Sequence, residues 1–185
     1  MPTELRERIL DEALGLMAEQ GAAGTSMRQL AGACGVQVAA LYHYFESKDA
    51  LLAAVIAERN YGRRIAEPLE LDPYAPPEQR LRSIFQQMWD GAIEEESVWR
   101  LLLGEGIRSE PSALPVGRDL LDTVMPGVAV FVRDCVPEIA DPDTAAELLL
   151  SQMFLGFIRH MFDPTGDVAE IGRDRADVLV NTLLR

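Results

Sequence analysis

The chain has 185 residues, 48% of them apolar, which is enough for a sizeable hydrophobic core and excludes a disordered chain. Its net charge of −13 argues against general coating of nucleic acid or of a membrane surface. The uncharged apolar stretches are shorter than the roughly 20 residues of a membrane-spanning helix, and no apolar signal-peptide segment follows Met1, so we expect a cytoplasmic protein without a membrane partner.

The first predicted helix covers residues 3–20. Gly21 is positioned to end this helix in a left-handed cap. Apolar side chains recur along the helix at helical spacing and form one stripe, which consists of Ile9, Leu10, Ala13, Leu14 and Met17.

Two short helices are predicted next. Ser26 followed by Gln29 fits a capping box, and the helix that it starts must stop at Gly35. A third helix covers residues 38–44, and Ser47 can cap a fourth that continues to about residue 64. Met27, Leu30 and Ala31 on the second helix, and Leu41 and Phe45 on the third, are the expected core residues.

The rest of the chain also has helical periodicity, so we predict an all-α fold. Asp141 and Pro142 form a strong helix start, with an Asp cap before a proline in the first turn. Pro126 and Gly127 are expected to kink or split one helix, and residues 123–132 leave a strand as an alternative. The later helices are predicted at 77–95, 97–109, 115–135, 142–162 and 168–184.

Two short helices joined by a tight glycine turn form a helix-turn-helix pattern, whose second helix can enter the DNA major groove. By itself this pattern is weak, because many helical hairpins exist only for packing. The amino-acid sequence of this segment is a more specific signal than the pattern. It consists of Gly24-Thr-Ser-Met-Arg-Gln-Leu-Ala31, then Cys34-Gly-Val36, then Leu41-Tyr-His-Tyr-Phe-Glu-Ser-Lys-Asp-Ala-Leu-Leu52. Together with the preceding Arg8-Ile-Leu-Asp-Glu-Ala-Leu14, this sequence resembles the N-terminal domain of the TetR family of transcriptional regulators.

The resemblance implies a DNA-binding domain at residues 3–63, with the helix-turn-helix at 26–45, and a helical ligand-sensing and dimerisation domain at 65–185. It implies operator DNA and a small-molecule effector as partners, a homodimer and, as a base rate, repression. It also implies that Tyr42, Tyr44, Lys48 and Arg28 approach the DNA backbone. The alternatives without a DNA contact are a half-buried Tyr42 that packs on the first helix, a solvated Lys48 and an exposed helix arginine at Arg28.

The segment before and in the recognition helix departs from the family's pattern. The cap position holds Gln37 where the family often has Ser or Thr, and Val38, Ala39 and Ala40 follow. Gln37 can bond adenine and the apolar residues can pack on thymine methyls, so we expect few direct contacts together with readout of DNA shape. His43 is expected to face outward and is a further candidate for a phosphate contact.

The second domain is rich in large apolar side chains. Most must be core, yet a sensor needs a cavity, and aromatic and Met side chains suit an apolar ligand. Arg100, Arg108 and His160 are weaker candidates for a polar ligand group. The candidate ligand residues are Phe85, Met88, Trp89, Trp99, Leu103, Met125, Phe131 and Phe157.

The last two helices resemble the dimerisation pair of the family. Gly156 would allow close backbone approach, and two helices from each subunit would form a four-helix bundle. The candidate interface residues are Leu149, Met153, Gly156, His160, Leu179 and Leu183.

Other classes of function have less support in the sequence. The common catalytic motifs and the P-loop are absent, so we expect no enzyme. Cys34 and Cys135 are interpreted as small core residues without metal-ligand spacing, and no metal or cofactor is expected. A redox sensor at Cys34 is a minor variant. The remaining alternative is a helical dimer that binds ligand or protein but not DNA, suggested by the acidic charge and the apolar residues 38–40.

Overall fold

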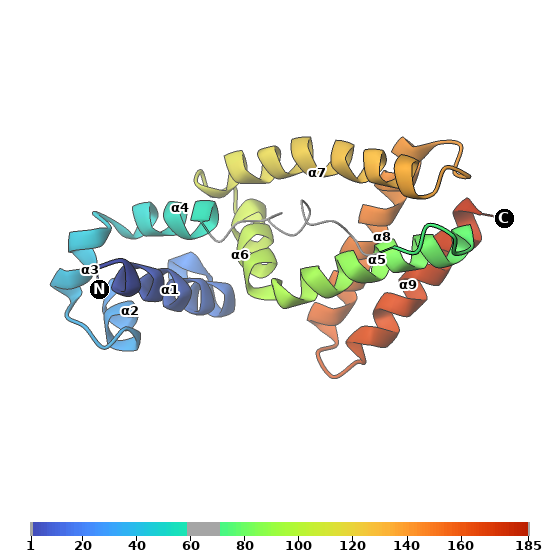
Figure 1. Cartoon of the computed structure of the whole chain (residues 1–185). Helices are drawn as coiled ribbons and strands as arrows, with labels where there is room; N and C mark the ends of the chain where they lie inside the picture. The colour runs from blue at the N-terminus through green and yellow to red at the C-terminus, as the bar shows by residue number, and fades with distance from the viewer. Residues whose placement is uncertain (1, 59–70, 185) are drawn as a thin grey trace. The chain divides into compact units, whose positions relative to one another are not determined.

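A computed structural model describes residues 2–58 and 71–184, and its regular structure within these ranges is entirely α-helical. The all-α prediction is therefore confirmed. In the N-terminal part the helices are α1 (Pro2–Gly24), α2 (Met27–Ala33), α3 (Val38–Tyr44) and α4 (Lys48–Glu58) (Figure 1). They are followed by α5 (Pro77–Glu94), α6 (Glu96–Ile107), α7 (Ala113–Cys135), α8 (Pro142–Phe162) and α9 (Val168–Leu183). Within the described ranges, no helix is both long enough and apolar enough to cross a membrane.

The chain forms two compact units, and the division does not follow the chain order. The first unit contains α1 to α4, α6 and the start of α7 up to Leu120. The second contains α5, the rest of α7, α8 and α9. The predicted boundary at residues 63–65 and the predicted end of the fourth helix near residue 64 lie outside the described residues. Placing α6 in the first unit differs from the predicted division, in which the whole of 65–185 forms one domain.

The core of the first unit is built on the predicted stripe of α1. Ile9, Leu10, Ala13 and Met17 are buried, whereas Leu14 is half-buried at its edge. These side chains pack together with buried residues from the other helices of the unit, including Leu30, Leu41, Leu51, Val55, Ile56, Leu101 and Leu102.

Gly21 interrupts α1 in a different way from the one predicted. Its φ of 77° is positive, as expected, but its ψ of 157° lies outside the left-handed helical region. The N–H of Ala22, directly after the break, donates to the carboxylate of Glu105 in α6, and the chain makes a further turn to Gly24. Local cap rules do not include this tertiary hydrogen bond, which is why the sequence predicted a simple end.

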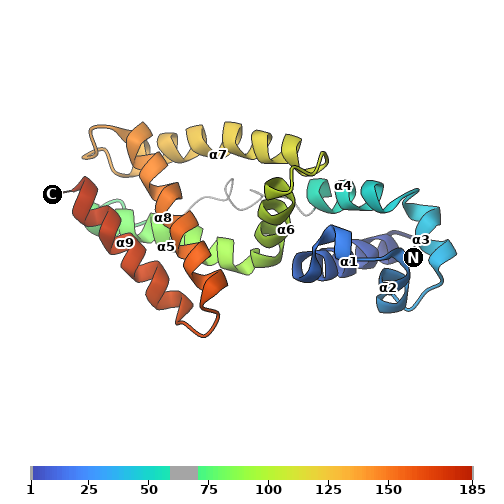
Figure 2. The same ribbon diagram turned by 180° about the vertical axis from the view of Figure 1, so that it is seen from behind.

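In the second unit, α5, α8 and α9 pack against one another, and Figure 2 shows the α8–α9 pair from behind. Asp141 caps α8 as predicted, with its carboxylate accepting the N–H of Thr144 at 3.0 Å. The helix α7 runs unbroken through Pro126, so the strand alternative for residues 123–132 and a split at this proline are both wrong. Pro126 is exposed, so water can bond the carbonyl that loses its amide partner.

Candidate nucleic-acid interface

The predicted capping box at the start of α2 is present. The Ser26 hydroxyl accepts the N–H of Gln29 at 3.2 Å, and the Gln29 side-chain oxygen accepts the N–H of Ser26 at 2.9 Å. Two backbone donors at the helix start are thereby satisfied by neighbouring side chains. The first turn of α2 is fixed by its own sequence.

Gly35 ends α2 and turns the chain toward α3. Its φ of 64° is left-handed, its N–H bonds the carbonyl of Gly32 at 3.1 Å, and the N–H of Val36 bonds the carbonyl of Ala31 at 2.9 Å. These two bonds form a Schellman motif, which satisfies the last carbonyls of the helix. The turn leaves Gln37 at the N-cap of α3 with no side-chain capping bond.

Two buried side chains anchor α3 in the core: Leu41, which is fully buried, and Phe45, which directly follows the end of the helix. Its opposite face carries Ala39, Tyr42 and His43, all exposed, at the i, i+3 and i+4 positions of one helical side. Tyr42 is 50% exposed, so half of its surface is open for a contact outside the unit. The outward orientation expected for His43 is confirmed.

The other predicted contact residues of this segment divide by exposure. Arg28 and Gln37 are exposed. Val38, Ala40 and Tyr44 are half-buried, and Val38 and Tyr44 pack against the core of the first unit. The open surface of the helix-turn-helix is therefore narrower than the predicted set of residues.

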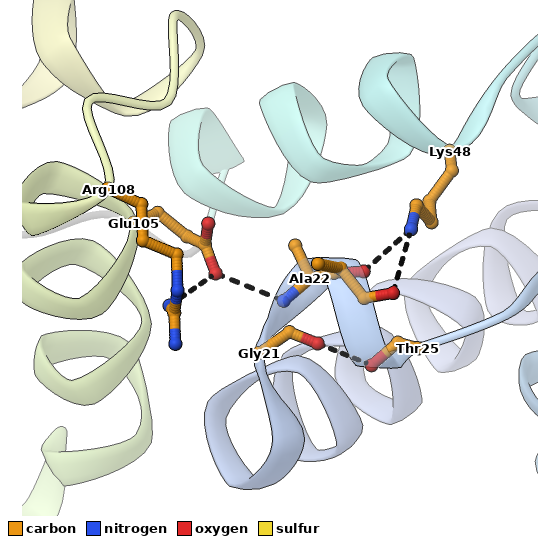
Figure 3. Close-up of polar contacts among 7 residues, drawn as sticks. Gly21, Ala22, Thr25, Lys48, Glu105 and Arg108 are labelled. Atoms are coloured by element: carbon orange, nitrogen blue, oxygen red, sulfur yellow. Dashed lines mark hydrogen bonds and ion pairs between the residues drawn. The ribbon is translucent and has the colours of Figure 1, made fainter.

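Lys48 is bonded within the protein. Its ammonium donates to the carbonyl of Ala22 at 2.8 Å and lies 3.5 Å from that of Ala23, at the C-terminal end of α1 (Figure 3). A cation is favourable there, because the carbonyl end of a helix carries partial negative charge. The alternative of a solvated surface lysine is wrong, because the contact joins α4 to α1.

Arg6 supports the recognition helix from α1, a role that the sequence did not indicate. Its guanidinium makes a bidentate pair with Glu58 of α4, both N–O distances being 2.6 Å, and stacks over the Phe45 ring with 5.3 Å to the centroid. The hydrogen-bonded carboxylate of Glu58 raises the pKa of Arg6. Arg6 thereby connects α1, α4 and the end of α3.

Cys34 lies in the core between the two short helices, as expected, whereas Cys135 is only half-buried. Burial raises the pKa of the Cys34 thiol. A thiol with a raised pKa holds less of the reactive thiolate, which argues against a redox sensor at this position.

Trp89, a candidate ligand residue, belongs to the core of the second unit. It is fully buried, stacks on Phe85 with 6.4 Å between the ring centroids, and donates its indole N–H to the carbonyl of Val168 at 3.1 Å. A Cβ added to Gly156 or Gly172 would lie 2.9 Å or 2.5 Å from the Trp89 ring. Both glycines therefore make room for this indole.

The remaining ligand candidates are distributed over both units. Trp99 and Leu103 are half-buried on α6 in the first unit. Phe157 is buried in the second unit, where Met88, Met125 and Phe131 are half-buried. Of the candidates for a polar ligand group, Arg100 pairs with Glu96 at 2.5 Å and Arg108 with Glu105 at 3.1 Å, whereas His160 is buried.

The predicted dimer residues mostly face the interior of their own unit. Leu149, Gly156, His160 and Leu179 are buried, and Met153 and Leu183 are half-buried. The role predicted for Gly156, a close approach between subunits, is replaced by its contact with Trp89. The exposed apolar side chains of α8 and α9 are instead Phe154, Leu155, Phe162 and Val178.

A second apolar stripe on α8 could have been found in the sequence. Leu155, Ile158 and Phe162 recur at i, i+3 and i+7, beside the predicted interface stripe of Leu149, Met153, Gly156 and His160. A helix that is apolar on two sides can use one for its own core and the other for a partner. The sequence does not say which side is which.

Taken together, a capped helix-turn-helix carried by α1 and α4, followed by a second helical unit, has the architecture of the helix-turn-helix class of DNA-binding regulators. Residues 9–55 match the sequence model of a family described as "Bacterial regulatory proteins, tetR family". The HTH-type transcriptional regulator AcrR of Shigella flexneri is 34% identical over 99 residues, which cover 50% of this chain and 44% of AcrR. The N-terminal part of the chain, residues 9–55, therefore belongs to the tetR family of bacterial regulatory proteins.

Solved structures share the fold over nearly the whole chain. A transcriptional regulator from Rhodococcus sp. Rha1 aligns with a TM-score of 0.74 at 22% identity, covering 97% of this chain and 95% of that one. The TetR family regulator PfmR from Thermus thermophilus aligns with a TM-score of 0.69 at 27% identity, covering 94% and 97%. In contrast, the match with AcrR spans less than half of that curated relative.

Proposed function

We propose that this chain is a ligand-responsive transcriptional regulator that acts in the cytoplasm as a repressor and is released from its operator by a small, largely apolar molecule. The observation that carries the proposal is the exposed side of α3. Tyr42 and His43 project from a short helix that Leu41 anchors in the core and that a Schellman turn joins to α2. A short helix exposed in this way can enter the major groove.

The proposed DNA-contacting surface follows from the exposure of each side chain. Ala39 and Gln37 are exposed where base edges would lie, which suits methyl packing and one amide contact. Lys48 has three N–H donors, so the contacts with Ala22 and Ala23 leave one for a phosphate. The proposed contacts are therefore Arg28, Gln37, Ala39, Tyr42, His43 and Lys48, and the half-buried Val38, Ala40 and Tyr44 are proposed only at the edge of this surface.

A homodimer would bring two such helices to one operator. The exposed apolar side of α8 carries Phe154, Leu155 and Phe162, and Phe162 is 83% exposed. We propose that a second copy of the chain packs against this side. Met153 and Leu183, both half-buried, remain candidates at its edge. A two-fold axis would place the recognition helices roughly 34–36 Å apart, or somewhat more.

The effector is proposed to be apolar because the half-buried candidates are apolar or aromatic. These candidates are Met88, Met125 and Phe131 in the second unit, and separately Trp99 and Leu103 in the first unit. A transcriptional regulator FadR from Bacillus subtilis, 16% identical with a TM-score of 0.65, was crystallised in complex with stearoyl-CoA. Stearoyl-CoA is therefore a sensible first probe in an effector screen.

The test of this proposal is binding of the purified protein to DNA upstream of its own gene, measured by fluorescence anisotropy across a salt series. We expect sequence-specific binding with two chains per site, with affinity falling steeply as salt rises. Equal affinity for unrelated DNA at every salt concentration would contradict the proposal. If the operator lies elsewhere, selection of bound sequences from random DNA with the same protein would identify it.

A second candidate is a helical dimer that binds an effector or a protein but not DNA. It is favoured by the apolar residues 38–40, by the net charge of −13, and by the bonding of the only lysine to α1. Failure of both the upstream DNA and the random-sequence selection would support this candidate.

A further inference from the structure

Ala22, near the end of α1, is hydrogen-bonded from two other helices. Its N–H donates to Oε1 of Glu105 in α6 at 3.0 Å, and its carbonyl accepts from Nζ of Lys48 at 2.8 Å (Figure 3). Lys48 is the first residue of α4, shortly after α3 ends at Tyr44. We call Ala22, Glu105, Arg108 and Lys48 the Ala22 joint.

Glu105 is an unusual residue for its position. It is only 3% exposed and lies where α6 contacts α1, a place that an apolar side chain could fill without the cost of removing a carboxylate from water. The same Oε1 also accepts from Nη1 of Arg108 at 3.1 Å. The two donors offset part of that cost, and they fix the direction in which the carboxylate points.

The backbone of α1 is shaped to meet this carboxylate. Gly21, with φ 77° and ψ 157°, adopts a conformation that is essentially restricted to glycine. The hydroxyl of Thr25, itself buried, donates to the Gly21 carbonyl at 3.0 Å and holds the turn that follows. The contact between α1 and α6 at this point therefore consists of directional bonds, which resist sliding more than apolar packing does.

We infer that Glu105 is a positioning residue for DNA binding, which through Ala22 and Lys48 fixes the first turn of α4, and with it α3, relative to α6. The inference rests on the proposed function, because its readout is operator affinity. It assigns an effect on DNA binding to a buried side chain of α6 that does not itself lie on the proposed DNA surface.

The test uses the full chain and an operator selected with the wild-type protein from random-sequence DNA. Glu105→Leu removes the acceptor at similar volume, and we expect operator affinity to fall by about tenfold, within the usual range of coupling between sites. Glu105→Gln keeps a carbonyl acceptor for the Ala22 N–H, and we expect affinity within about threefold of wild type. The slope of affinity against salt should be unchanged in both, because no phosphate contact is removed.

A double-mutant cycle with Lys48→Met tests the route through Ala22. If both side chains act through this residue, adding Glu105→Leu to Lys48→Met should weaken binding by no more than about twofold further. Multiplication of the two separate effects would overturn the route. An unchanged affinity for Glu105→Leu would overturn the inference altogether.

General loss of stability is controlled by substitutions elsewhere in the same core. Ile9 is fully buried on α1 away from the joint, and Ile9→Val and Ile9→Ala give a graded loss of stability. At a temperature where all variants are folded, both should bind the operator within about twofold of wild type. If the Ile9 variants lost as much operator affinity as Glu105→Leu, the inference would be wrong. If the wild-type protein selects no sequence, the proposed function fails and the inference with it; if it selects one and Glu105→Leu binds equally well, only the inference fails.

Discussion

The ring of Trp89 lies against the backbone of Gly172: a Cβ built on this glycine would be 2.5 Å from Cδ1 of the indole. Trp89 has no exposed surface, so the ring cannot move aside without disturbing its stack with Phe85 and its hydrogen bond to Val168. The close approach of α5 and α9 thus depends on the absence of a side chain at one position.

Substitution of Gly172 by Ala is therefore expected to destabilise the protein, by about 1–3 kcal/mol, which is typical of overpacking in a core. Gly127→Ala is the matched control, because Gly127 is also helical and an added Cβ there meets nothing within 4 Å. The control should be neutral or stabilising by up to about 1 kcal/mol. Urea denaturation of both variants measures the difference, and equal midpoints would contradict the packing described for Trp89.

Gly35 and Gly32 offer a second matched pair, which tests the turn of the helix-turn-helix. An added Cβ meets nothing within 4 Å at either position, but only Gly35 has a positive φ, of 64°. Gly35→Ala should cost about 1–2 kcal/mol, because an L-residue is strained in the left-handed region. Gly32→Ala, inside α2, should be neutral or stabilising. Thermal unfolding of the two variants side by side gives the answer, and a Gly35→Ala protein as stable as Gly32→Ala would exclude a strained turn.

Removing the hydroxyl of Tyr42 should weaken operator binding. We expect Tyr42→Phe to lose about 1 kcal/mol, or roughly fivefold in affinity, the usual net contribution of a hydrogen bond. The melting temperature should not change, since the side chain is half exposed. Tyr74→Phe, at a position 95% exposed in the second unit, is the control and should bind like wild type. Anisotropy titrations that give one affinity for all three proteins would remove Tyr42 from the proposed DNA surface.

A charge on the exposed apolar side of α8 should disrupt the proposed dimer. Phe154 is 54% exposed, so Phe154→Asp should preserve the fold of each subunit but raise the dimer dissociation constant by about tenfold or more. Leu121→Asp, on α7 at 62% exposure, is the matched control. Sedimentation velocity over a concentration series separates the outcomes. A Phe154→Asp protein that stays as dimeric as Leu121→Asp would assign the interface to another surface.

Acid should abolish the contribution of the Asp141 cap. Its hydrogen bonds with the N–H and the hydroxyl of Thr144 lower the pKa of Asp141. A carboxylate with a depressed pKa in the folded state stabilises the protein above its unfolded pKa, and this stability is lost as pH falls through the folded value. Asp141→Ala should therefore melt below wild type at neutral pH, and the gap should close as the pH falls below the ordinary range for aspartate. A gap that is the same at neutral and acid pH would contradict the cap's charge-dependent role.

Local sequence determined the helical class of the chain and several of the helix ends. The capping box at Ser26 and Gln29, the Asp141 cap and the Gly35 turn each involve residues within five positions of one another, so their hydrogen bonds could be predicted from the sequence alone. The outward orientation of His43 followed from helical spacing on an anchored helix. That these residues contact DNA stays a prediction.

Only the tertiary structure decided which apolar and polar side chains serve the core. Periodicity identifies a stripe on a helix but not its partner, so Trp89 and Gly156 were assigned to a ligand site and a dimer interface, although they pack against each other. Lys48 and Glu105 meet at Ala22 although they lie far apart in the chain. Their hydrogen bonds depend on how α1, α4 and α6 pack together. The sequence of one helix does not predict where another helix packs against it.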